Sequence, residues 1–128
     1  THMDAVLQLL NRYNLQDPVG NNNAGEFNNA DLQELYIKLV ELGSTSISDA
    51  LRVGATIEDL DIFDLENALT KIDNQDIRLV YENLTKGSRN HLRSFYSNIL
   101  ISGETYAPQF ITQEKFDAIV NSPMEKGR

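Results

Sequence analysis

Glutamate and histidine placed on two predicted helices are the residues best able to do chemistry. Glu58 interrupts an apolar helical line, and His91 lies on the apolar stripe of a later helix. An unpaired carboxylate in a protein core costs several kcal/mol, so Glu58 implies a partner. One interpretation is a buried or half-buried Glu–His hydrogen bond that fixes helix register. The other is a metal site, because imidazole and carboxylate on facing helices suit iron, manganese or zinc. Spacing alone favours the hydrogen bond.

Two more polar residues, Asp61 and Ser88, are expected in the same region, and a third, Glu82, is not. Asp61 breaks the apolar line one turn from Glu58, and Ser88 lies one turn before His91 on the stripe. Glu82 falls on the opposite side of that helix from His91, so it is predicted to be a surface residue. Asp61 and Ser88 are thus expected near the Glu58–His91 level.

Glycine in the middle of the same long helix is explained most simply by packing. A mid-helix glycine costs roughly 0.5–1 kcal/mol against alanine, so Gly87 predicts a helix passing close by, with Gly54 as the expected counterpart. The surrounding "KGSR" (86–89) lacks the upstream glycine and the strand–loop–helix context of a phosphate loop, which excludes that motif.

Helices account for nearly the whole chain. Apolar spacing of three and four predicts a first helix that Asp17-Pro18 ends, and the Asn- and Gly-rich stretch after it is a loop. The third helix, opened by Ser46 and Asp49, is either one bent helix or two helices that divide near 61–64. Stretch 101–110 is predicted to be an exposed connection. The expected apolar stripes lie at 3–14, 32–42, 47–72, 77–99 and 116–120, with caps at Asn28 or Asn29, Asn74 and Thr112.

This pattern predicts an all-α fold in a single domain, residues 1–128. No alternating run of β-branched residues supports a sheet. The residues expected to be most buried are Leu51, Ile57, Leu65, Val80, Leu84, Leu92 and Phe95.

Composition narrows the class of function. The net charge of −8 disfavours binding to nucleic acid and to anionic membranes. The lack of cysteine excludes disulfides and thiolate metal sites and leaves the compartment undetermined. No apolar run approaches the roughly 20 residues that span a bilayer.

Three blocks of the sequence carry a resemblance to a known family: "HMDAVLQLLNRYNLQDPVG", "GATIEDLDIFDLENAL" and "DNQDIRLVYENLTKGSRNHLRSF". Together they resemble a prokaryotic ferritin-like family of unknown function, distantly similar to rubrerythrins, over His2 to about Val120. The resemblance implies a ferritin-like helical bundle. Such bundles take one carboxylate from each of two helices and a Glu-x-x-His pair from each of the other two to hold two metal ions.

The resemblance also implies roles for individual residues. Glu58 matches the lone carboxylate of one bundle helix, and His91 and His2 match the two histidine positions, with Asp61 next to the ligands. Ser88 stands where the motif has a glutamate, and no residue stands three places before His2. The chain is therefore expected to be a fragment that lacks the first bundle helix and part of the ligand set. The alternative is that "THM" at the start is partly a cloning remnant and that the match of the opening stretch is coincidental.

Two functions follow as alternatives. The longer protein is expected to be a di-iron type redox or iron-handling protein, holding iron or another divalent metal, with a degenerate site and no metal in this chain. Alternatively, the domain is a helical structural or interaction module without catalysis. No reaction or substrate is implied, and secretion of the longer protein is compatible with the sequence. Because a bundle lacking one helix exposes an apolar groove, a second copy is expected to cover it as a homo-oligomer.

Overall fold

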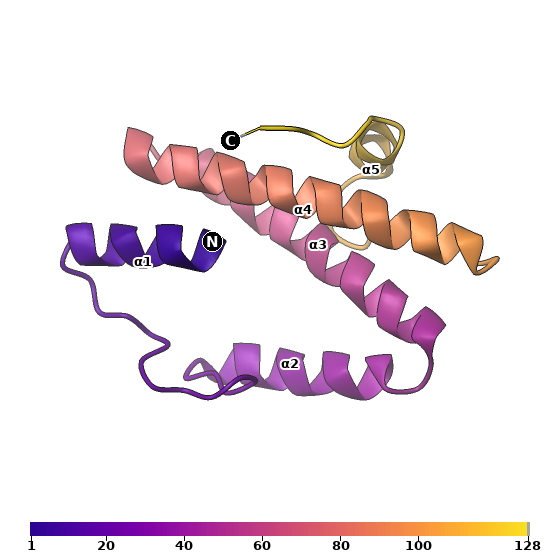
Figure 1. The fold of residues 1–128 in the computed structure, drawn as a ribbon, viewed down its shortest axis with the longest axis horizontal. Coiled ribbons are helices and arrows are strands. Elements are labelled where there is room, and N and C mark those ends of the chain that lie inside the picture. Colours follow the sequence, from indigo (N-terminus) through magenta and orange to yellow (C-terminus); the bar gives the residue numbers. More distant parts are fainter. Residues whose placement is uncertain (128) are drawn as a thin grey trace.

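Residues 1–127, which this computed structural model describes, form five α-helices. They contain no strand, so the all-α prediction is confirmed for this part of the chain. None of these helices is long and apolar enough to cross a membrane. In chain order the helices are α1 (His2–Arg12), α2 (Ala30–Gly43), α3 (Ile47–Leu69), α4 (Gln75–Ile101) and α5 (Gln113–Val120) (Figure 1).

Short polar side chains begin each helix, as the sequence predicts for four of the five. The cap oxygen accepts a hydrogen bond from a backbone N–H of the first turn that has no partner within the helix. At α1, Thr1 and Asp4 complete a capping box. The caps of α2 to α5 are Asn29, Ser46, Asn74 and Thr112, which confirms the predicted positions.

Two helix boundaries resolve or correct the sequence prediction. The third segment is one continuous helix, α3, without a division near 61–64. The first helix ends at Arg12, before the predicted stop at Asp17-Pro18. Asn14 adopts a positive φ of 54°, which asparagine tolerates better than most residues, and this ends the helix.

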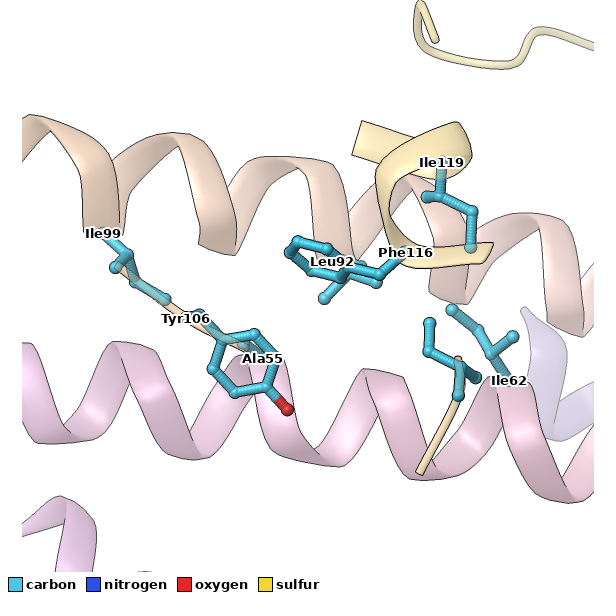
Figure 2. Packing of buried hydrophobic residues seen from close by; sticks show 8 residues of the cluster. Ala55, Ile62, Leu92, Ile99, Tyr106, Phe116 and Ile119 are labelled. Carbon is cyan, nitrogen blue, oxygen red and sulfur yellow. The ribbon is translucent and has the colours of Figure 1, made fainter. Parts of the chain in front are cut away.

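The core lies between α3, α4, α5 and the segment that joins α4 to α5. α3 and α4 run alongside one another, and α5 lies next to α4 (Figure 1). Figure 2 shows Phe116 and Ile119 of α5 reaching toward Leu92 of α4 and Ile62 of α3. Edge-to-face packing of Tyr96 on Phe116, with ring centroids 5.0 Å apart, extends this cluster. The buried apolar residues are Ala55, Ile62, Leu92, Ile99, Tyr106, Ile111, Phe116 and Ile119.

The predicted core is confirmed only in part. Leu92 is fully buried, whereas Ile57 is 39% exposed, so its prediction is wrong. The buried line of α3 runs through Ala55, Asp59 and Ile62. Ile57 lies two residues from both Ala55 and Asp59, about 200° around the helix, so it faces away from the core. The other predicted core residues, Leu51, Leu65, Val80, Leu84 and Phe95, are half-buried.

A buried carboxylate holds the segment between α4 and α5 against α3. Asp59 has no exposed surface and accepts hydrogen bonds from the Tyr106 hydroxyl (2.7 Å) and from three successive backbone N–H groups, those of Gln109, Phe110 and Ile111. Burial, and then the bond to Asp59, raise the pKa of Tyr106. The prediction that 101–110 is an exposed connection is therefore wrong at Tyr106, which is 7% exposed.

Helices α1 and α2 each pack against one neighbour only. Among the described helices, α1 lies against α4 and α2 against α3, and neither His2–Arg12 nor Ala30–Gly43 contains a buried residue. Several of their apolar side chains are exposed to solvent, for example Met3 (72% exposed) and Ile37 (56% exposed). A bundle helix normally buries its apolar stripe, so these faces lack cover within the described residues.

Candidate functional site

Glu58 on α3 and His91 on α4 form a hydrogen-bonded pair. Glu58 Oε1 lies 3.1 Å from His91 Nδ1. This contact confirms the predicted Glu–His pairing across the two helices. The Glu58 side chain is 13% exposed and that of His91 is 60% exposed, so the pair runs from the protein interior to its surface. An ionised carboxylate only accepts hydrogen bonds, so Nδ1 is the donor and Nε2 of a neutral ring keeps a free lone pair.

A hollow of about 430 Å³ adjoins this pair and gathers every site residue that the sequence predicts. Its polar lining consists of side chains from three helices, with Leu65 and Leu84 as apolar neighbours. The polar lining residues are His2 from α1, Glu58, Asp61 and Asp64 from α3, and Ser88 and His91 from α4. His2 and Asp61 thus line the same hollow as Glu58 and His91, but Asp61 and His91 are exposed and do not lie in the bundle interior as predicted. Their role as metal ligands stays a prediction.

The pKa of Asp61 is raised above its ordinary value. Partial burial, followed by the charges of Glu58 and Asp64, raises the pKa of Asp61 to about 6, and His91 acts in the opposite direction. Asp61 as a residue is exposed, but its carboxyl group loses part of its solvation and lies near two other acidic side chains. Positive charge brought into the hollow would relieve this repulsion.

One buried carboxylate oxygen of the site lacks a hydrogen-bond partner in the described part of the chain. Glu58 Oε2 is buried and makes no hydrogen bond within residues 1–127. An unpaired buried polar atom costs about 1–3 kcal/mol, so Oε2 is an acceptor available to a donor or a cation. In this part of the chain, however, no three histidine or acidic side chains are placed so that together they could hold a metal ion. The donor types fit a divalent metal, but their arrangement supplies an incomplete set.

The mid-helix glycine of α4 is explained by a histidine ring. A Cβ atom at Gly87 would lie 2.7 Å from Cε1 of His2, so the absence of a side chain lets the α1 ring approach α4. The predicted pairing of Gly87 with Gly54 is wrong, because Gly54 instead accommodates the Phe95 ring, which a Cβ atom at residue 54 would overlap. Each glycine thus makes room for an aromatic ring of another helix.

Ser88 occupies a buried position in the hollow, 7% exposed. At the position where the resemblance led us to expect the glutamate of a metal-binding motif, this chain therefore has a short neutral side chain that lines the hollow. Glu82 is exposed, as predicted from its place on the opposite side of α4.

Sequence reasoning missed two carboxylates that organise the structure. Asp59 shares the buried line of Ala55 and Ile62, and its polar character on that line is the signal that could have identified it. Glu125 pairs with Arg89 and Arg93 of α4. Glu125 has no such local signal, because its partners lie 32 and 36 residues away in sequence.

Comparison with known proteins places the chain in a family. Residues 1–123 match the family described as "Uncharacterized protein domain (DUF2202)". The Uncharacterized protein MJ0754 of Methanocaldococcus jannaschii is 55% identical over 127 residues, which are 99% of this chain and 69% of that protein. The crystal structure of hypothetical protein MJ0754 superposes with a TM-score of 0.95 and covers 97% of this chain and 71% of that chain. None of these names mentions a ferritin, a rubrerythrin or a metal.

Proposed function

The chain belongs to the DUF2202 family, and from the site described above we propose that its hollow between α1, α3 and α4 is a divalent-metal site of the ferritin-like, di-iron type in degenerate form. The residues proposed to contribute are Glu58 and His91, with His2 as a further ligand and Asp61 next to them. The observation that carries the proposal is the free Oε2 of Glu58 beside the His91 ring.

The chemistry of these groups supports the choice of a divalent cation. Oε1 of Glu58 orients the imidazole and leaves Oε2 of Glu58 as a carboxylate donor. Because Nε2 of His91 lies on the far side of the ring from this hydrogen bond, Glu58 and His91 would bind one ion together only if the ion displaces the bond. Carboxylate and imidazole together suit iron, manganese and zinc. A bound metal would supply Lewis acidity and, in the case of iron, redox chemistry. Since Ser88 provides no charge, this chain alone is expected to bind metal weakly, and we assign no reaction to it.

Calorimetric titration of the purified chain with ferrous iron under argon, and separately with manganese, tests the proposal. We expect one saturable site that Glu58→Gln and His91→Gln each weaken at least tenfold, as loss of a ligand or its support does. Glu41→Gln, an exposed change on α2, is the matched control and should bind as the unmodified chain does. Absence of saturable binding, or equal binding by Glu58→Gln, would exclude the metal site.

A second candidate function, a helical interaction module, rests on a different observation. The apolar faces of α1 and α2 lack cover within the described residues, and such faces are commonly buried by another chain. On this view the Glu58–His91 bond only fixes helix register, and the chain associates with a second copy through these faces. Light scattering as a function of concentration measures this directly, and a monomer at high concentration would argue against it.

A further inference from the structure

The end of the described chain is held against α4 by a bidentate ion pair. Glu125 Oε1 accepts from Arg89 Nη2 (2.6 Å) and Oε2 accepts from Arg89 Nε (2.7 Å). Oε2 also accepts from Arg93 Nη1 at 2.9 Å. Two parallel N–H···O bonds to one guanidinium fix the position and direction of a carboxylate. The two arginines lower the pKa of Glu125 to about 2, so this carboxylate is ionised at neutral pH.

The backbone on either side of this carboxylate is bound as well. The Asn90 side chain accepts from the Glu125 N–H (2.9 Å) and donates to the Glu125 carbonyl (3.0 Å). Two residues further on, Lys86 Nζ donates to the Gly127 carbonyl (3.0 Å). Asn90 thus bonds both main-chain groups of one residue, as a neighbouring strand would. Such main-chain bonding is how extended peptides are recognised, with a side-chain contact supplying specificity.

The groups that make these contacts are already in place on α4. Lys86, Arg89, Asn90 and Arg93 follow the spacing of one helical face. The Arg93 side chain is 8% exposed, and its Nε donates to the Ile119 carbonyl at 2.8 Å, which fixes its position. Arg93 Nη1 also donates to Oδ1 of Asn90 at 2.8 Å and so orients the amide that binds the Glu125 backbone. Arg93 and Asn90 are thus held by contacts besides those to residues 124–127, which would lower the cost of binding an extended segment.

We propose that this face of α4 is a binding site for an extended peptide that carries a glutamate, and that residues 124–127 of the chain occupy it in cis. None of these four residues is a proposed metal ligand, although the proposed ligand His2 lines a hollow together with Lys86, Asn90 and Glu125. Because a tethered ligand has an effective concentration of the order of mM, an acidic peptide from another chain can enter only when the chain's own segment is weakened or displaced. The site is therefore self-occupied in the resting protein.

A peptide of residues 121–127 (Asn-Ser-Pro-Met-Glu-Lys-Gly, with an amidated end) is the probe that tests this proposal. It is titrated into the full chain and into Glu125→Gln, with amide chemical shifts of α4 as the readout. We expect the peptide to bind Glu125→Gln at least tenfold more tightly than the unmodified chain, because the internal competitor has lost its charge. The shifts should map to Lys86, Arg89, Asn90 and Arg93.

Three controls make the outcome decisive. Glu114→Gln, an exposed change on α5 of the same chemistry, should bind the peptide as the unmodified chain does. The same peptide with glutamine at the position of Glu125 should bind at least tenfold more weakly. Arg89→Gln combined with Glu125→Gln should abolish binding, since the bidentate partner is gone. Equal binding by the two peptides, or no gain in Glu125→Gln, overturns the proposal.

Hydrogen exchange on the unmodified chain tests the same proposal if Glu125→Gln does not fold. The Glu125 amide should exchange through local opening at least tenfold faster than helical amides in the middle of α4, and added peptide should accelerate it further by competition. The proposal is overturned if the Glu125 amide exchanges at the rate of the α4 amides and the peptide does not change that rate. The segment would then be a fixed part of the core.

Discussion

Replacing Asp59 with asparagine perturbs the contact that fixes the segment between α4 and α5. Asp59 Oδ2 accepts from the Tyr106 hydroxyl (2.7 Å) and the Gln109 N–H (2.6 Å), and Oδ1 accepts from the Ile111 N–H (2.8 Å). The Phe110 backbone N lies 3.2 Å from Oδ1. Asparagine keeps the shape of the side chain, but one of its two terminal groups becomes a donor that faces other donors.

The expected loss of stability follows from these contacts. At least one buried donor is left unpaired in Asp59→Asn, at a cost of about 1–3 kcal/mol. The remaining bonds lose their charge assistance, which is worth on the order of 1 kcal/mol in total. We therefore expect the free energy of unfolding to fall by about 3 kcal/mol and the midpoint temperature to fall by roughly 10 °C.

Urea unfolding followed by circular dichroism measures this change. Asp73→Asn, at an exposed position before α4, is the control and should stay within about 0.5 kcal/mol of the unmodified chain. Tyr106→Phe removes one of the bonds and should cost about 1 kcal/mol, and the double variant should lose less than the sum of the two. A loss below about 1 kcal/mol in Asp59→Asn would refute the reasoning, because it would mean that the buried donors find other partners.

Four further predictions concern the rest of the molecule. Asp61→Asn should stabilise the protein near pH 7 by up to about 1 kcal/mol after solvent screening and have little effect below pH 4. Because the pKa of Asp61 is raised to about 6 in the folded protein, its ionisation lowers stability as pH rises toward that value, and urea unfolding at several pH values measures the difference. Gly54→Ala should cost about 1–3 kcal/mol, because the new Cβ would overlap the Phe95 ring; thermal unfolding that shows no loss would contradict this contact. Ser88→Glu should raise manganese affinity in calorimetry and lower stability without metal, since it adds a carboxylate to the hollow. The chain should self-associate, and light scattering should show this association weakening when Ile37→Glu adds charge to the open face of α2.

Local signals account for what the sequence predicted correctly. A helix cap such as Asn74 or Thr112 bonds a backbone N–H only three residues later, so the start of each helix could be predicted from the local sequence. The Glu58–His91 contact followed from helical periodicity on two long helices and from the cost of an isolated carboxylate. The ferritin-like topology, which rested on resemblance, and the metal site, which rested on resemblance and on the spacing of Glu58 and His91, stay predictions.

Contacts between residues far apart in the sequence account for the features that sequence analysis missed. Asp59 is satisfied by Tyr106 and by backbone groups about 50 residues later, in a segment without periodicity. Its polar character on the line of Ala55 and Ile62 could have marked Asp59, but nothing local identifies these partners. The neighbour of Gly87 proved to be the His2 ring because the path of α1 across α4 depends on tertiary contacts. Ile57 was misplaced because several lines of α3 are apolar, and only packing decides which line faces α4.

Paramagnetic broadening by manganese tests the proposed metal site most directly. Substoichiometric Mn²⁺ is added to the ¹⁵N- and ¹³C-labelled chain, and the loss of signal is followed for each residue. The proposal predicts that His91, Asp61 and His2 broaden first, and that Glu58→Gln removes this selectivity while Glu41→Gln preserves it. Broadening that is spread over exposed carboxylates elsewhere, or that is unchanged in Glu58→Gln, would contradict a metal site in this hollow.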